Sequence, residues 1–217
     1  MPVKHLNETS LPHPRHSLLD AEQVTLVKSG EDYFTWVIDI INRSQHKLHL
    51  QTYIFIDDET GKAVIEALQK AVARGVKVFL LVDAFGSFAM SNEGIAAIKK
   101  SGIQFRTFSP LFVRRRIHFG RRLHHKILVA DQSEALIGGI NIEDKYHFKK
   151  NDNTPWLDYA VYITGPVCQH IDGMCEHLWK GKFYRERRKA HSPIINAQEK
   201  KAGIHLKIRQ NDWANKK

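Results

Sequence analysis

Between residues 47 and 108 the sequence alternates between apolar runs and amphipathic stretches, and this alternation restricts the fold more than any other feature. The run Val76–Val82 is almost continuously apolar, which is typical of a strand buried on both faces. Before it, Thr60–Arg74 carries apolar residues at helical spacing, and Gly75 stands where a C-cap glycine is expected. Lys47–Ile56 and Ile103–Phe108 are further strand candidates.

Strands that alternate with helices predict an α/β fold. We expect a mixed, mostly parallel β-sheet flanked by helices on both faces. The remaining predicted strands are Gln23–Lys28, Lys126–Ala130, Ala135–Ile137, Trp156–Thr164 and Ile204–Arg209. The remaining predicted helices are Tyr33–Asn42, Ser91–Ser101 and Val167–Phe183.

The predicted domain covers residues 21–190, between a flexible lead-in at 1–20 and a basic C-terminal tail at 191–217. Within the tail, the alternation of Ile204–Arg209 echoes Val24–Asp32, so the tail is a candidate for the start of a second repeat. The N-terminus lacks the apolar core of a signal peptide. No apolar run approaches the roughly eighteen residues of a membrane span.

The net charge of +10 favours anionic partners. Nucleic acid and anionic lipid headgroups both qualify, and charge alone does not separate them. Cys168 and Cys175 are seven residues apart on one predicted helix, and no CxxC motif is present. We expect both to be small buried residues in a reducing cytosol.

The segment from Leu123 to Asn141 places ionisable residues beside a buried strand in the pattern H-x-K-x4-D-x6-G-G-x-N. Its members are His124, Lys126, Asp131, Gly138, Gly139 and Asn141. Side chains two apart on a strand point to the same face, so His124 and Lys126 are expected side by side. Each residue alone would be unremarkable: a partly buried histidine, a solvated lysine, a turn asparagine. Together, at fixed spacing, they favour a shared chemical role.

This pattern resembles the signature of the phospholipase D superfamily, H-x-K-x4-D-x6-G-[GS]-x-N, at every position. The stretches LHLQTYIF at 48–55, VKVFLLVDAFGS at 76–87 and WLDYAVYITGPV at 156–167 resemble the N-terminal half of bacterial cardiolipin synthases. The likeness covers roughly residues 24 to 183. It implies a phospholipase D-like half and a phosphatidyltransferase that converts two phosphatidylglycerol molecules into cardiolipin and glycerol. It implies no metal and no cofactor.

The resemblance also implies roles for individual residues. His124 would attack phosphorus and form a phosphohistidine intermediate. Lys126 and Asn141 would hold the non-bridging phosphate oxygens, where charge accumulates in the transition state. Gly138 and Gly139 would let substrate approach the backbone closely.

Four neighbouring residues have other expected roles. Asp131 belongs to the catalytic motif, yet we expect it to be structural, orienting the loop or pairing with a basic side chain. Asp158 is the candidate for holding the His124 ring through its other nitrogen. His125 should point to the opposite strand face and pack there. Gln51 stands where many members carry Glu, which leaves its role open.

Five arginines precede the motif, at positions 114, 115, 116, 121 and 122. They are either a solvated basic loop or a site for phosphate. Their place directly before His124 favours the second interpretation, with Arg121 and Arg122 as substrate-binding candidates.

The superfamily mechanism uses two motifs, and this sequence contains one. Either two copies pair so that each site receives two histidines, or a missing C-terminal half supplies the second motif, which the echo in the tail favours. The implied substrate is the anionic phospholipid phosphatidylglycerol, and the implied location is cytoplasmic, peripheral at the inner membrane surface. The alternatives are a homodimeric single-motif phosphodiesterase or nuclease, and a half-enzyme that only binds anionic phosphates.

Overall fold

The structure is a computed structural model that describes residues 18–109, 122–147, 156–181 and 203–209, and the backbone of two short strands between them. The strands are β1 (Leu19–Ala21), β2 (Gln23–Lys28), β3 (Lys47–Thr52), β4 (Lys77–Asp83), β5 (Gln104–Phe108), β6 (Phe112–Val113), β7 (Arg116–Ile117), β8 (Lys126–Ala130), β9 (Glu134–Gly138), β10 (Tyr159–Thr164) and β11 (Ile204–Leu206). The helices are α1 (Glu31–Arg43), α2 (Glu59–Ala73), α3 (Asn92–Lys100) and α4 (Val167–Trp179), with a 3-10 turn, η2, at Asp144–Tyr146.

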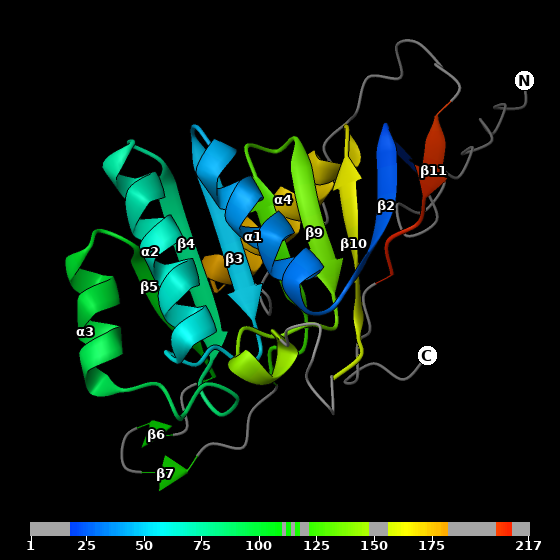
Figure 1. Ribbon diagram of the computed structural model, residues 1–217. Coiled ribbons are helices and arrows are strands. Elements are labelled where there is room, and N and C mark those ends of the chain that lie inside the picture. Colours follow the sequence, from blue (N-terminus) through cyan, green and yellow to red (C-terminus); the bar gives the residue numbers. More distant parts are fainter. Residues whose placement is uncertain are drawn as a thin grey trace, which may run out of the picture.

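A seven-stranded sheet forms the centre, in the order β2-β10-β9-β8-β3-β4-β5 (Figure 1). The mixed sheet between helices confirms the predicted fold class. The expectation of a mostly parallel sheet is wrong, because only the β3–β4 and β4–β5 pairs are parallel, and the other four pairs are antiparallel. Apolar runs indicate buried strands but not their direction, and β8 and β9 are joined by a tight turn that reverses the chain.

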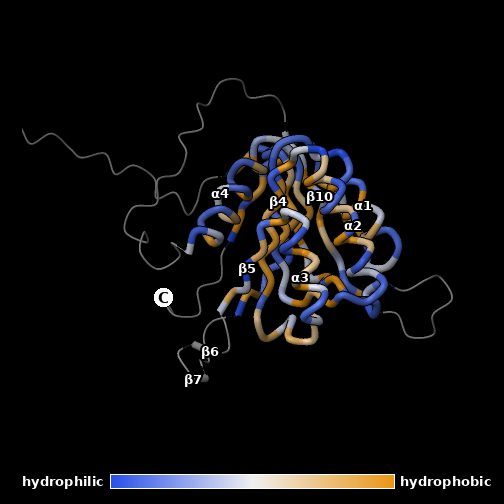
Figure 2. The backbone as a smooth tube through the Cα atoms, turned by 90° about the vertical axis from the view of Figure 1, so that its left-hand side faces the viewer, coloured by the Kyte–Doolittle hydropathy of each residue, from blue (hydrophilic) through white to orange (hydrophobic). Residues whose placement is uncertain are grey.

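Helices cover both faces of this sheet. In Figure 1, α1 and α2 lie in front of the sheet, α4 lies behind it and α3 stands beside β5. The front face packs into one large apolar cluster, and the back face packs with α4 into a second. Figure 2 shows hydrophobic residues concentrated along the strands and the inner sides of the helices. Cys168 and Cys175 belong to α4 and are both buried, as predicted.

Local signals fix the helix ends where the sequence predicted them. Ser91 caps α3 by accepting a hydrogen bond from the Gly94 N–H, and Asp58 caps α2 in the same way through Gly61. Gly75 follows α2 with a φ of 93°, a left-handed backbone that glycine adopts without strain.

Outside the central sheet, β1 and β11 pair antiparallel, with Leu19 opposite Leu206. The described part of the C-terminal tail is therefore a strand that meets the segment preceding β2. Within the described ranges, no helix is long and apolar enough to cross a membrane.

The ends of several strands meet at one end of the sheet, which we call the site end. The strands β3, β4 and β9 finish there, and β8 and β10 begin there. Because β8 lies near the middle of the sheet, the residues just before it stand at the centre of the site end.

Candidate active site

The segment that enters β8 is anchored to the end of β4. The fully buried Asp83 accepts a hydrogen bond from the Leu123 N–H through Oδ2, at 2.8 Å. The Leu123 side chain is itself buried, against Leu81 and Leu178. This anchor fixes the backbone immediately before His124.

The His124 ring is exposed at the site end and lies flat against Tyr53. The two ring centroids are 4.5 Å apart and the planes differ by 16°. The Lys126 Nζ atom lies 5.4 Å from the centroid of the same Tyr53 ring, and it donates to the His124 carbonyl at 2.9 Å. One aromatic side chain therefore contacts both motif residues, and they lie side by side as the strand spacing predicted.

Asn141 is buried, and its amide is oriented by the neighbouring chain. Its Oδ1 accepts from the Ile54 N–H at 3.1 Å, and its Nδ2 donates to the Tyr146 hydroxyl at 2.8 Å. Since a backbone N–H only donates, the oxygen must face Ile54. The segment Tyr53–Ile54 after β3 thus contacts all three motif side chains: His124, Lys126 and Asn141.

Lys126 is partly buried at the site end. Burial lowers the pKa of its ammonium, and the nearby carboxylate of Asp158 partly opposes that shift. Asp158 was predicted to hold the His124 ring, but among the described residues no hydrogen bond joins the two. Its Oδ1 instead accepts from the Tyr159 N–H at 2.7 Å. Asp158 is a charge neighbour of Lys126 in this structure.

The two glycines of the motif are explained by the approach of β10. A Cβ atom on Gly138 would lie 2.5 Å from the Tyr159 carbonyl oxygen, and one on Gly139 would collide with the Asp158 carboxylate. Access of substrate to the backbone, the role that the resemblance implied, is therefore not needed to account for these glycines.

Asp131 lies at the far end of β8, about 17 Å along the strand from Lys126. It accepts the backbone N–H groups of Gln45, His46 and Lys47 at 2.7, 2.8 and 2.8 Å. Burial opposes its ionisation, but these three donors outweigh it and hold the pKa of the carboxyl below its usual value. Asp131 therefore does not belong with the catalytic candidates. It is a structural residue that fixes the start of β3 by accepting backbone N–H groups, and not by pairing with a basic side chain.

Arg122 lies at the site end but faces the protein. Its guanidinium is 3.6 Å from the Asp83 carboxylate, donates to the Ser109 carbonyl at 3.3 Å and lies 5.4 Å from the centroid of the Phe85 ring. Arg121, the other predicted substrate-binding arginine, lies outside the described residues.

His125 points to the opposite face of the sheet from Lys126, as predicted, and belongs to a buried polar chain. The Gln51 side chain is fully buried, and its Nε2 donates to the Cys175 carbonyl of α4 at 2.8 Å. Gln51 Oε1 therefore faces His125 Nε2 at a distance of 2.8 Å. Because an amide oxygen only accepts hydrogen bonds, His125 Nε2 must carry the proton. Burial lowers the pKa of His125 to about 4, so its ring is neutral near pH 7. This chain ties the residue next to His124 to α4.

Sequence reasoning missed Tyr53. It lies seventy residues before the motif, and only the pairing of β3 with β8 brings it there. Tyr53 lies inside the predicted strand Lys47–Ile56, where the strand pattern alone gives no signal for a site residue. No group of three or more His, Cys, Asp or Glu side chains in the described residues is arranged to hold a metal ion.

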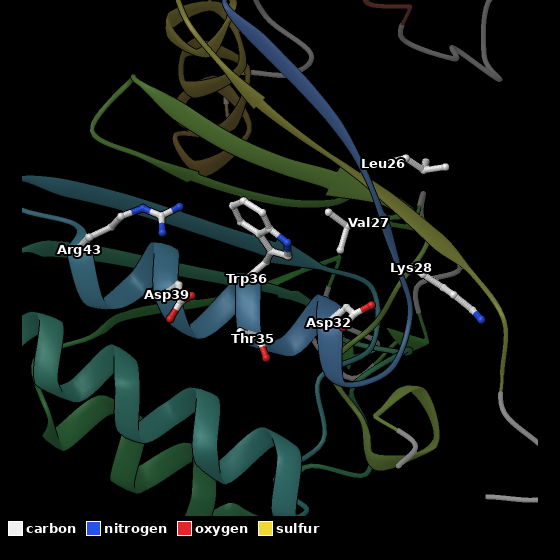
Figure 3. A pocket seen from close by; sticks show the side chains of 8 residues that line it. All are labelled: Leu26, Val27, Lys28, Asp32, Thr35, Trp36, Asp39 and Arg43. Atoms are coloured by element: carbon white, nitrogen blue, oxygen red, sulfur yellow. The ribbon is translucent and has the colours of Figure 1, made fainter. Parts of the chain in front are cut away.

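A groove of about 390 Å³ lies elsewhere, between α1 and the edge strand β2 (Figure 3). Trp36 and Arg43 of α1 and Leu26 and Lys28 of β2 contribute to its lining. It contains no motif residue, and three strand spacings, about 14 Å, separate β2 from β8. The candidate active site is therefore the exposed ring of His124 and its neighbours at the site end.

Comparison with known proteins assigns the family. A family profile described as "Cardiolipin synthase, PLD-like domain" matches residues 37–179, about two thirds of the sequence. The chain belongs to this phospholipase D-like family.

Curated relatives carry the name cardiolipin synthase. Cardiolipin synthase B of Escherichia coli K12 is 32% identical over 198 residues, which cover 89% of this chain and 48% of that protein. Cardiolipin synthase of Geobacillus thermodenitrificans is 34% identical over 200 residues, covering 88% of this chain and 39% of that protein. The chain thus spans less than half the length of these relatives.

Solved structures support the fold. The phospholipase D family member Nuc of Salmonella typhimurium matches with a TM-score of 0.56 and 22% identity, over 73% of this chain and 94% of that one. Phosphatidylserine synthase of Haemophilus influenzae matches with a TM-score of 0.59 and 18% identity, over 73% and 37%.

Proposed function

We propose that this chain is one half of a phosphatidyltransferase of the phospholipase D superfamily, acting on phosphatidylglycerol as cardiolipin synthases do. The observation that carries the proposal is the contact of Tyr53–Ile54 with His124, Lys126 and Asn141. This contact gathers the exposed ring of His124, the Lys126 ammonium and the buried Asn141 amide at one point of the site end. The names of the curated relatives supply the lipid class.

In the proposed reaction an imidazole nitrogen of His124 attacks the phosphorus of phosphatidylglycerol. The bond from phosphorus to the glycerol oxygen breaks, and glycerol leaves with a proton from a general acid. Lys126 and the second N–H of the Asn141 amide stabilise the charge on the non-bridging oxygens. The hydroxyl of a second phosphatidylglycerol then attacks the phosphohistidine, loses its proton to the same acid–base group and releases His124.

The general acid in this proposal comes from a partner of this chain. A second histidine from another copy of the chain, or from a C-terminal half, would fill that role. We place the enzyme peripherally at the cytoplasmic face of the inner membrane, with phosphatidylglycerol as its substrate.

Turnover on phosphatidylglycerol vesicles tests the proposal. The purified chain should form cardiolipin and glycerol, or phosphatidic acid where water replaces the acceptor, and His124→Ala should form none. His46→Ala is the matched control, because His46 is exposed beside Asp131 at the far end of β8. An acid-labile phosphatidyl group on His124, trapped by rapid quenching in alkali, would support the intermediate.

If the isolated chain is inactive, adding a separately produced second half should restore turnover that depends on His124. Failure of that mixture would refute the lipid reaction. Cleavage of DNA by the wild-type chain and not by His124→Ala would establish the nuclease alternative instead.

A further inference from the structure

Hydrophobic side chains are unusually exposed at the site end. The described residues include eight exposed large hydrophobic side chains, and five of them lie there: Phe85, Phe88, Trp156, Leu157 and Tyr159. Phe85 and Phe88 are 51% and 75% exposed, and Trp156 and Leu157 are 55% and 56% exposed. We call these last four residues the aromatic rim.

The rim has two parts that stand on either side of the nucleophile. Phe85 and Phe88 follow β4, whereas Trp156 and Leu157 precede β10. In the sheet order β10-β9-β8-β3-β4, each part is two strand spacings, about 10 Å, from the strand that His124 enters. The two hydrophobic parts therefore bracket the His124 ring.

The Phe85–Phe88 loop is held outward by its own hydrogen bonds. Asp83 Oδ1 accepts from the Phe85 and Gly86 N–H groups at 2.8 and 3.1 Å. The Ser87 hydroxyl donates to the Tyr53 carbonyl at 3.1 Å and accepts from the Phe55 N–H at 2.9 Å. Because the backbone is fixed, the two phenyl rings are presented to solvent instead of folding back onto the core.

Positive charge accompanies the rim. The Arg122 guanidinium lies over the Phe85 ring, and Lys126 lies between the two parts of the rim. The carboxylates of the nearby β3 and β4 loops are engaged inside the protein: Asp57 by Ser91, Asp58 by the α2 N-terminus, and Asp83 by Leu123. Hydrophobic tips with cations behind them fit the boundary between acyl chains and anionic headgroups.

We propose that the aromatic rim is the surface by which this chain docks on an anionic lipid bilayer, with its four side chains inserted around the headgroup that His124 attacks. The proposal rests on the proposed function, because a phosphodiester attached to two acyl chains stays in the bilayer, and His124 must be brought to it. The site end then faces the membrane, and its exposed hydrophobic residues leave water on docking.

Sedimentation with large vesicles tests the docking surface without needing turnover. The probes are phosphatidylglycerol vesicles and, for comparison, phosphatidylcholine vesicles. The wild-type chain should prefer the anionic ones. Phe85→Ser/Phe88→Ser and Trp156→Ser/Leu157→Ser should each weaken binding about tenfold or more. Leu26→Ser is the matched control, because Leu26 is 68% exposed but lies on the edge strand β2, and its binding should equal that of the wild type.

A fluorescence signal for insertion into the bilayer distinguishes a loss of docking from poor folding of the serine variants. Phe88→Trp should show a blue-shifted emission with phosphatidylglycerol vesicles, and lipids brominated on their acyl chains should quench it beyond the wild-type background. Unchanged emission and unchanged sedimentation of the serine variants would overturn the proposal. A shift of the serine variants from dimer to monomer without loss of vesicle binding would also overturn it, and would make the rim a contact between copies. Weaker binding to duplex DNA alone would assign the rim to nucleic acid and overturn it as well.

A soluble substrate separates this proposal from the proposed function. On monomeric short-chain phosphatidylglycerol, the Phe85→Ser/Phe88→Ser variant should lose a smaller fraction of its turnover than on vesicles, because no docking is needed. If neither the wild type nor any variant turns over phosphatidylglycerol even with a second half added, the proposed function fails, while the sedimentation result still decides whether the rim binds membranes.

Discussion

Asp131→Ala should lower the free energy of unfolding without lowering the turnover of the folded protein. The carboxylate accepts three backbone N–H groups, two of them from the exposed residues Gln45 and His46, where water replaces much of each bond. We therefore expect a loss of about 2 kcal/mol for the three together. The backbone φ at this position is 51°, and an alanine there costs about 1 kcal/mol more than an aspartate. The sum, about 3 kcal/mol, lowers the melting temperature of a chain of this size by roughly 6–12 °C.

Asp131→Asn is the matched variant. Asparagine tolerates the positive φ and keeps one side-chain oxygen, so we expect a loss of only about 1 kcal/mol and roughly 2–4 °C. Thermal unfolding followed by circular dichroism, together with turnover at 25 °C, measures both effects. The low pKa of Asp131 adds a pH signature: its contribution is present above the ordinary carboxyl pKa, near 4, and disappears as the pH falls through the lower folded value. The gap between wild type and Asp131→Ala should therefore narrow in acid. An Asp131→Ala protein that melts like the wild type, or one that is fully folded yet inactive, would refute the structural role.

Three further predictions concern the site and the core. Tyr53→Phe should keep most of the turnover, whereas Tyr53→Leu should lower it about tenfold because the ring that stacks on His124 is lost; steady-state kinetics on both variants measures this. Gly139→Ala should lower the free energy of unfolding by about 1–3 kcal/mol because its Cβ has no room, while Gly173→Ala, with nothing within 4 Å, should raise it by up to about 1 kcal/mol; urea denaturation compares them. Burial lowers the pKa of His49 and His125 to about 4, so the unfolded chain binds more protons below pH 6.5. Urea midpoints should therefore fall between pH 6.5 and about 4, and the fall should be reduced in His49→Leu/His125→Gln.

Patterns within one segment predicted local features well. The two-residue spacing put His124 and Lys126 side by side, and helical spacing with capping residues located α2 and α3 to within about two residues. The same strand rule put His125 on the opposite face. Each of these inferences uses only the repeat of a strand or a helix, which the sequence carries directly.

Relations between distant segments were harder to predict. Tyr53 and Gln51 meet the motif because β3 pairs with β8, and no pattern in either strand states that pairing. Asp158 was expected on the His124 ring and lies beside Lys126, since sequence position does not decide which of two neighbouring basic residues a carboxylate faces. The expectation that the mixed sheet is mostly parallel failed for the same reason: the composition of a strand indicates its burial, but its direction depends on the connections.

The central position of β8 has a consequence for local unfolding. This strand is hydrogen-bonded on both sides, to β3 and β9, and Leu128, Val129 and Ala130 are almost completely buried. Amide protons of such a strand exchange with solvent only when the whole domain opens, whereas the edge strands β2 and β5 fray with little cost. The segment that carries His124 is thus attached to the strand whose amide protons we expect to exchange most slowly. Loops at the site end can rearrange around the proposed lipid substrate while His124 itself stays in register.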